Sequence, residues 1–323
     1  MSVGPEVVTC GEAMLLMLAE PGVPLERAVA YRRSVAGAES NVATGLSRLG
    51  HQVRWLGRLG ADPAGAAVLR ELRAEGVDVS HVGTDSEAPT GLLLRDSHPE
   101  RAIDVQYYRA GSAASRLAPE HLSEDALTGA RLLHVSGITA MLSRSAAEAT
   151  RVLIERAVDA GVTVSFDPNV RRKLGSGHEW IRAIGPLLRE VDLVLAGEDE
   201  MELLLGGGAD EGARALLELG RAGAVVIKRR DRSASTFSAS GQRWDQQPFA
   251  VRAADPVGAG DAFAAGWLSA WLRGVAPQRA LAEAACVAAM VVQVPSDTDG
   301  LPTAESRDRT LATHQEGTDV VRR

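Results

Sequence analysis

Short, continuously apolar runs recur along the chain and alternate with longer stretches in which apolar residues return every three or four positions. The clearest runs lie at 132–136, 162–167, 193–195 and 225–228. These runs do not alternate between apolar and polar residues as a half-exposed strand does. Such continuous runs are typical of strands that are buried on both faces. Helical patterns lie between them, at about 143–160, 179–190, 198–205 and 211–222. This alternation predicts an α/β fold in which helices cover both faces of a parallel sheet.

The first third of the chain breaks this alternation. Strand patterns at 15–18 and 28–34 flank a turn-rich segment, and a second pair at 91–95 and 104–109 flanks a polar one. We expect these strands, drawn from about 12–34 and 90–113, to form a small β-sheet that covers one edge of the main sheet as a lid. The whole chain, 1–323, is predicted to be a single domain, with a flexible tail at 305–323 because that segment is polar.

The stretch Asp255-Pro256-Val257-Gly258-Ala259-Gly260-Asp261 predicts a tight turn that leads into a helix. Gly258 and Gly260 permit a close approach between the backbone and a ligand. A helix start leaves backbone N–H groups unpaired at the positive end of the helix dipole, so the turn is suited to bind an anion. Asp261 beside such a site is suited to accept a proton from a hydroxyl that attacks a bound phosphate. The alternative is a structural turn without a ligand.

These seven residues resemble the C-terminal signature of the ribokinase-like (PfkB) carbohydrate kinases. The resemblance implies that Asp261 is the general base and that the turn of Gly258, Ala259 and Gly260 is the anion hole for the transferred phosphoryl group. Residues 36–50, with Gly37 and Asn41, are similar to the N-terminal signature of the same family, although its usual first glycine is Ala36 here. With both signatures at the proper ends, the resemblance covers residues 6–303 and implies a ribokinase-like three-layer fold with a lid.

Further short stretches carry a narrower resemblance: Gly11-Glu12, Gly37-Ala38-Glu39, residues 107–113, Ser136-Gly137-Ile138 and Asp167-Pro168-Asn169-Val170-Arg171. Within the family, they make the chain most similar to the 2-keto-3-deoxygluconate kinases. The resemblance implies that the pocket for a sugar acid is lined by Gly37, Asn41, Tyr107, Arg109, Ile138 and Arg171. The strand pattern agrees, because Tyr107 and Arg109 are two residues apart and therefore share one face, while Tyr108 points away. The alternative for Arg109 is a surface salt bridge. One departure is Leu93, which stands where these kinases often carry another tyrosine.

The resemblance also implies a nucleotide side of the site and the use of ATP and Mg²⁺. It assigns Lys228, Asp255, Gly258 and Gly260 to the nucleotide, and Glu200 to Mg²⁺ through water. The alternative for Glu200 is an acidic residue that favours a helix start. The family's glycine-rich turn after Lys228 is replaced by residues 229–233, which read Arg-Arg-Asp-Arg-Ser. These residues either crowd the phosphates or neutralise them, and the sequence leaves both possibilities open.

Composition limits the class of partner. The chain has 35 Lys and Arg residues against 42 Asp and Glu, so its net charge is −7, and no basic block argues for a nucleic-acid or membrane surface. Cys10 and Cys286 stand in apolar surroundings, as expected for buried thiols in a reducing compartment. No apolar run approaches the ~20 residues that cross a bilayer. We therefore expect a cytoplasmic enzyme that forms a homo-oligomer through its lid.

The sequence thus predicts an ATP-dependent sugar-acid kinase that phosphorylates a primary hydroxyl, with 2-keto-3-deoxygluconate and its 6-phosphate as substrate and product. A kinase of a neutral sugar such as fructose or ribose is the nearest alternative. The altered residues 229–233 also leave open a catalytically weakened homologue that only binds nucleotide or sugar. A nicotinamide oxidoreductase fits less well, because the Gly-x-Gly turn lies near the C-terminus and not after the first strand.

Overall fold

An eight-stranded sheet forms the centre of the computed structural model, which describes residues 4–98 and 102–316. The strand order is β14-β13-β12-β11-β10-β9-β1-β4, and all pairs from β12 to β4 are parallel. The strands are β1 (Val7–Cys10), β4 (Val53–Leu56), β9 (Leu132–Ser136), β10 (Thr163–Asp167), β11 (Leu193–Gly197), β12 (Ala224–Lys228), β13 (Ala234–Ser238) and β14 (Arg243–Gln246). The predicted parallel sheet is confirmed, and β13 and β14 extend it at one end through antiparallel pairs.

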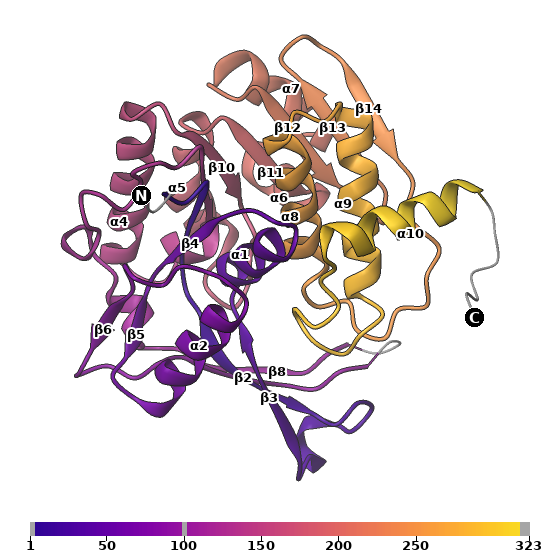
Figure 1. Ribbon diagram of the computed structural model, residues 1–323. Coiled ribbons are helices and arrows are strands. Elements are labelled where there is room, and N and C mark those ends of the chain that lie inside the picture. The colour runs from indigo at the N-terminus through magenta and orange to yellow at the C-terminus, as the bar shows by residue number, and fades with distance from the viewer. Residues whose placement is uncertain (1–3, 99–101, 317–323) are drawn as a thin grey trace.

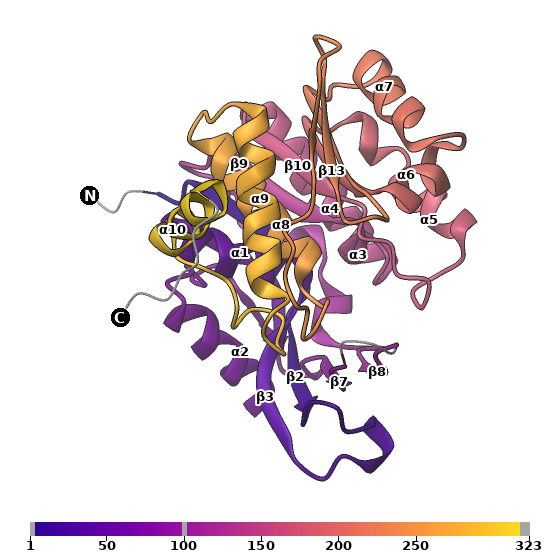
Figure 2. The ribbon, with the colours of Figure 1, turned by 90° about the vertical axis from the view of Figure 1, so that its right-hand side faces the viewer.

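Helices cover both faces of this sheet. One layer holds α1 (Ala38–Arg48), α2 (Pro63–Ala74), α8 (Ala259–Leu272) and α9 (Pro277–Val291), and the other holds α4 (Arg144–Asp159), α5 (Gly177–Ile184), α6 (Glu198–Leu205) and α7 (Ala209–Leu219). Figure 2 shows the sheet between α1, α8 and α9 on one side and α5, α6 and α7 on the other. On β1, Val7 faces the first layer and Val8 the second. Because both faces are buried, these strands need apolar residues at nearly every position.

A second, four-stranded sheet lies at one end of the molecule (Figure 1). It consists of β3 (Tyr31–Ala36), β2 (Met14–Ala19), β7 (Leu92–Arg95) and β8 (Val105–Tyr108), in that order. Met14, Leu16 and Leu93 form its own small apolar cluster. The strand ranges expected for the lid do join one sheet, except that β3 extends two residues beyond 34.

Several elements differ from the sequence prediction. The pattern did not predict β13 and β14: β13 is buried but carries three Ser or Thr residues among its five, and the edge strand β14 is half-exposed and mostly polar. The helix predicted at 179–190 ends at Ile184, shortly before Pro186, which cannot continue the hydrogen-bond ladder. The remaining short elements are β5 (Arg58–Gly60), β6 (Gly83–Asp85), α3 (Gly137–Ala140) and 3₁₀ turns at 25–27, 113–116, 119–121 and 187–189.

The C-terminal segment is more ordered than its polarity predicts. Residues 304–316 form α10 (Ala304–Glu316), where a flexible tail was expected, whereas 317–323 lie outside the described residues. Arg307 of α10 is buried and its guanidinium lies 3.2 Å from the carboxylate of Glu283 on α9. This ion pair anchors a helix whose sequence carries little apolar signal. None of the helices described is both long and apolar enough to cross a bilayer.

Candidate active site

A pocket of about 490 Å³ lies where the carboxyl ends of the parallel strands meet the four-stranded sheet. Asp167 ends β10, Lys228 ends β12, and the turn before α8 closes the floor between them. The four-stranded sheet contributes residues such as Leu93 and Tyr107 to the same pocket. Ligands of open parallel sheets bind at this edge, so the position agrees with the sequence prediction.

The turn at the floor of the pocket has the backbone geometry that its glycines predict. Gly258 has φ +83° and caps α8, in a left-handed conformation that favours glycine. A Cβ atom at Gly258 would lie 2.5 Å from the carbonyl oxygen of Asp297. The backbone N–H groups in the first turn of α8 have no acceptor within the helix. Two residues of this turn, Gly260 and Asp261, line the pocket. This arrangement can hold a phosphate group.

Asp261 stands in the first turn of α8 and lines the pocket. Asn41 donates from Nδ2 to Oδ2 of Asp261 at 2.8 Å, and Asn169 donates to Oδ1 at 3.5 Å. Burial raises the pKa of Asp261 to about 7, against the opposing effects of the Asn41 hydrogen bond and of Arg171. A carboxylate with a pKa near the working pH is suited to general base catalysis.

We expect kcat/KM to fall about tenfold per pH unit below about 7 and to be constant above it, because only the ionised Asp261 accepts a proton. The raised pKa places this step well above the range of an ordinary aspartate. Burial also raises the pKa of Glu12, in the same pocket, to about 7. Glu12→Gln is therefore the control, and its kcat/KM should still fall below about pH 7 if Asp261 is the titrating group. A flat profile between pH 5.5 and 7.5 would exclude this role for Asp261.

Of the residues predicted for the sugar side, all six line the pocket: Gly37, Asn41, Tyr107, Arg109, Ile138 and Arg171. Gly37 has φ +154°, and a Cβ atom there would collide with the carbonyl oxygen of Glu12. Tyr107 and Arg109 share a face, with the guanidinium carbon 5.3 Å from the ring centroid, while Tyr108 is 56% exposed. The expected alternation along this strand is confirmed.

Arg109 has a protein partner that the sequence analysis did not assign to the site. Its guanidinium forms an ion pair with Glu12, a buried residue that follows β1, and its Nε atom has no hydrogen-bond acceptor among the described residues. Arg109 is therefore a pocket residue and not a surface one, but its charge is already partly balanced. Burying either charge without the other would be costly, so the pair folds as a unit.

Three consecutive cations lie at the rim of the pocket. Arg171, Arg172 and Lys173 all line it and are exposed. Lys173 donates to the carbonyl oxygen of Val105 at 2.7 Å and Arg171 to that of Val170 at 3.1 Å. None of the three has a carboxylate partner within 4.0 Å among the described residues. An anionic ligand would supply the missing counter-charge.

Of the side chains predicted to bind nucleotide, Lys228 lines the pocket but Asp255 does not. Lys228 lines the pocket and donates to Asp167 Oδ2 at 2.6 Å, and Asp167 in turn accepts from the backbone N–H of Asn169. Asp255, predicted to contact nucleotide, is fully buried instead. It accepts from Arg95 at 2.6 Å and from the N–H of Val257 at 3.0 Å. Its carboxylate is thus used inside the protein, because the buried Arg95 requires a counter-charge.

Glu200, predicted to hold Mg²⁺ through water, caps the start of α6. Its carboxylate accepts from the N–H groups of Gly197 at 2.7 Å and Val170 at 2.6 Å, and burial raises its pKa. Residues 4–98 and 102–316 contain no group of three or more His, Cys, Asp or Glu that could hold a metal ion. Mg²⁺ is commonly bound by one or two carboxylates together with substrate phosphates and water.

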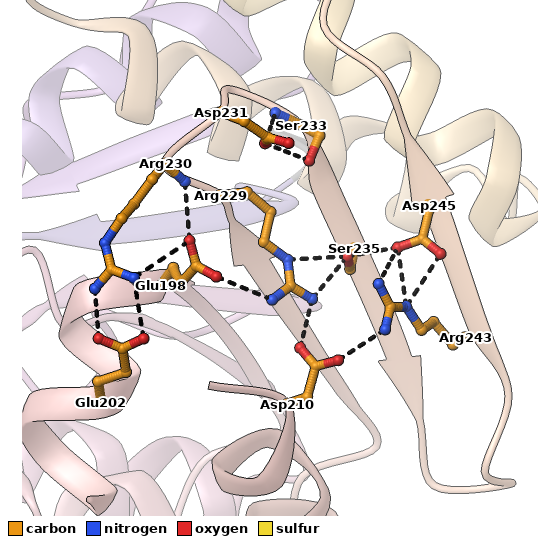
Figure 3. A network of polar contacts seen from close by, with 10 residues as sticks. All are labelled: Glu198, Glu202, Asp210, Arg229, Arg230, Asp231, Ser233, Ser235, Arg243 and Asp245. Carbon is orange, nitrogen blue, oxygen red and sulfur yellow. Dashed lines mark hydrogen bonds and ion pairs between the residues drawn. The ribbon is translucent and has the colours of Figure 1, made fainter. Parts of the chain in front are cut away.

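The arginines that replace the expected glycine-rich turn after β12 are held by acidic residues (Figure 3). Arg229 pairs with Asp210 at 2.6 Å and with Glu198 at 3.5 Å. Arg230 pairs with Glu202 and, at 3.7 Å, with Glu198. These guanidiniums are therefore neutralised by α6 and α7. Arg232 takes φ +70°, so the turn keeps a left-handed residue without glycine.

Several pocket residues were not predicted from the sequence, among them Glu12, Arg95, Asn169 and Asp297. Asn169 had a local signal, since it belongs to the stretch Asp167-Pro168-Asn169-Val170-Arg171, and it takes φ +45° to reach Asp261. Arg95 and Asp297 had no local signal in the sequence, because each acts through a partner that is far away along the chain.

Comparison with known proteins gives near-complete matches. A model of the pfkB family carbohydrate kinases matches residues 5–304. A 2-dehydro-3-deoxygluconokinase of Bacillus subtilis (strain 168) is 37% identical over 302 residues, 93% of this chain and 93% of that protein. A 2-dehydro-3-deoxygalactonokinase of Haloferax volcanii is 35% identical, with 90% and 92% covered. The solved structure of a PfkB protein from Polaromonas sp. JS666 aligns with a TM-score of 0.83 at 38% identity, covering 94% of this chain and 99% of that chain.

Proposed function

Because this chain belongs to the pfkB family of carbohydrate kinases, we propose that it transfers the γ-phosphoryl group of ATP to a primary hydroxyl of a sugar acid. The substrate proposed is 2-keto-3-deoxygluconate (2-dehydro-3-deoxygluconate), and the product is its 6-phosphate. The name of the 37% identical Bacillus subtilis relative supports this choice. The observation that carries the proposal is Asp261, a carboxylate with a raised pKa at the start of α8, in a pocket whose rim cations have no carboxylate partner within 4.0 Å in the part of the chain that the structure describes.

In the proposed reaction the sugar hydroxyl oxygen attacks the γ-phosphorus in line with the leaving oxygen. The bond from this phosphorus to the β,γ-bridging oxygen breaks, ADP leaves with the electron pair, and the hydroxyl proton passes to Asp261. Asn41 holds Oδ2 of Asp261 at 2.8 Å, whereas Oδ1 has only the longer contact of 3.5 Å with Asn169 and can face the hydroxyl. The N–H groups at the start of α8 supply fixed dipoles where negative charge gathers on the transferring group.

The nucleotide side of the proposal rests on Lys228 and the turn of Gly258, Ala259 and Gly260. Lys228 carries its charge to the pocket beside Asp167 and is suited to contact phosphate. Mg²⁺, when bound, neutralises phosphate charge, and Glu200 would reach it through water. The paired arginines at 229 and 230 stabilise the neighbouring turn and leave the phosphates to Lys228 and the backbone.

The preference for an acid substrate is expected to be measurable. A charge-assisted hydrogen bond contributes roughly 1.5–3 kcal/mol, or about 10- to 150-fold in affinity. We therefore expect kcat/KM for 2-keto-3-deoxygluconate to exceed that for fructose or ribose by at least about tenfold. An ADP-release assay over acid and neutral sugars, with 2-keto-3-deoxygalactonate included because of the Haloferax volcanii relative, measures this.

Two variants test which cations recognise the acid. Arg171→Gln and Arg109→Gln should each lower kcat/KM for the acid more than for any neutral sugar. Arg171 is the cleaner probe, because it is exposed, whereas removing Arg109 leaves the buried Glu12 unpaired. Arg182→Gln, an exposed arginine of α5 outside the pocket, is the matched control. If a neutral sugar is the better substrate, or if both variants lower all sugars equally, the acid-sugar assignment is wrong.

We further propose a cytoplasmic homo-oligomer that forms through the four-stranded sheet. Tyr108 on the edge strand β8 is 56% exposed, and Val29, in the loop before the opposite edge strand β3, is 93% exposed. Exposed apolar side chains at these two edges would be covered by association with a second copy. Light scattering is expected to give a multiple of the 34.0 kDa chain mass, and Tyr108→Ser should shift it toward the monomer. A monomeric wild type at micromolar concentration would exclude this assembly.

A further inference from the structure

Arg95 joins three separate parts of the molecule. It is the last residue of β7, and it is 1% exposed although it carries a full charge. Its guanidinium donates to Asp255 at 2.6 Å, to Asp297 at 2.7 Å and to the carbonyl oxygen of Asp96 at 3.0 Å. One side chain of the four-stranded sheet, called the small sheet below, thus reaches two carboxylates of the main body, which is the eight-stranded sheet with its helices and loops.

Both carboxylates belong to segments that shape the turn before α8. Asp255 opens the turn, and its other oxygen accepts from the N–H of Val257. Asp297 lies in the loop after α9, and its carbonyl oxygen is the atom that a Cβ at Gly258 would meet at 2.5 Å. The backbones of the two segments are also joined, since the N–H groups of Ala254 and Asp255 both donate to Val292. Arg95 binds the carboxylates of both segments from the side of the small sheet.

The same cluster extends to the proposed base. Asn41 donates to Asp261 at 2.8 Å, and Asn41, Asp261 and Asp297 all line the same pocket. The carboxylate of Asp297, which Arg95 holds, and the proposed base Asp261 therefore face the same pocket. Without the guanidinium, two buried carboxylates would face each other beside a site for phosphate, and their repulsion would act on the turn and on the phosphate alike.

We propose that Arg95 is a positioning residue for phosphoryl transfer. It holds Asp255 and Asp297 so that the turn before α8 keeps its anion-binding shape, and it does so only while β7 is docked on the main body. The assembly of the transfer site is thereby coupled to the position of the small sheet. This inference rests on the proposed roles of Asp261 and the turn, but not on which sugar is phosphorylated.

The first test is Arg95→Ala with chemical rescue. We expect kcat to fall about 100-fold, since small misplacements of reacting groups cost that much, while KM for sugar and ATP changes far less. Millimolar guanidinium chloride should restore much of the lost kcat by occupying the space between the two carboxylates. Sodium chloride at the same concentration should not. Guanidinium would not restore the activity of a protein that is merely destabilised. A kcat loss below about tenfold overturns the proposal, and so does a larger loss that guanidinium fails to reverse.

Arg95→Lys keeps the inference testable if the alanine variant does not fold. An ammonium group keeps the charge but cannot bridge two carboxylates as a planar guanidinium does. We expect a folded protein with kcat lowered about tenfold and with both KM values within about threefold. Wild-type kcat, or an effect confined to KM, overturns the proposal.

Arg32→Ala is the matched control. Arg32 lies on β3 and also ties the small sheet to the loop after α9, through Asp299 and the carbonyl oxygen of Pro295, but it is exposed. Its loss should leave kcat within about threefold and without response to guanidinium, as for other exposed pairs. An equal loss in Arg32→Ala and Arg95→Ala would reduce Arg95 to a tether and overturn its positioning role. All arms use whichever sugar the wild type phosphorylates, so a wrong sugar assignment leaves this test intact.

Discussion

Asp261→Asn is expected to lower kcat by ~10²–10⁴-fold, the usual cost of losing a general base. Asparagine keeps the size of the side chain and a carbonyl oxygen for the Asn41 hydrogen bond, but it cannot take the proton of the attacking hydroxyl. Folding should be unaffected, because the substitution removes a buried charge that burial already disfavours. ADP release at saturating sugar and ATP, together with a thermal unfolding curve, measures both effects.

Asp199→Asn provides the matched control for this experiment. Asp199 also lies in the first turn of a helix, α6, but it is exposed and does not line the pocket. Its replacement should leave kcat within about twofold, as expected of a surface substitution away from the site. If Asp261→Asn keeps more than a tenth of wild-type turnover, the proton must go elsewhere and Asp261 is not the base.

The features that the sequence predicted are those that local chemistry encodes. Strands buried on both faces are rich in apolar residues, so β9, β10 and β12 were recognisable as short apolar runs although β9 and β10 also bury polar side chains. The turn before α8 requires glycine where φ is positive, so Gly258 was recognisable too. The resemblance to the PfkB kinases rested on such positions, and the match over residues 5–304 confirms it.

The features that the sequence did not predict depend on partners distant in the chain. Arg95 lies 160 residues from Asp255 and 202 from Asp297, so no local pattern indicated a buried ion cluster. For the same reason Asp255 was assigned to the nucleotide, although its carboxylate faces Arg95. Arg109 was expected in the pocket, but not its pairing with Glu12. Ion pairs of this kind follow from tertiary packing, because only the folded chain makes an unpaired charge there costly.

Gly258→Ala is expected to reduce turnover more than its effect on stability explains. A side chain at φ +83° costs roughly 1–2 kcal/mol of folding free energy. Its Cβ would in addition lie 2.5 Å from the carbonyl oxygen of Asp297, so the turn must move away from that loop. A displacement of the order of 1 Å in a positioned group can cost about 100-fold in rate, and we expect a kcat loss of that size.

Gly274→Ala separates strain from displacement. Gly274 follows the other end of α8 with φ +68°, and a Cβ atom there would meet no atom within 4 Å. The two alanine variants should therefore lose a similar part of their unfolding free energy from backbone strain, while only Gly258→Ala loses turnover per folded molecule. Unfolding curves and ADP release on the same preparations compare the two quantities. If turnover falls equally in both variants, the loss reflects the stability of α8, and the turn would then not be the anion site that its geometry indicates.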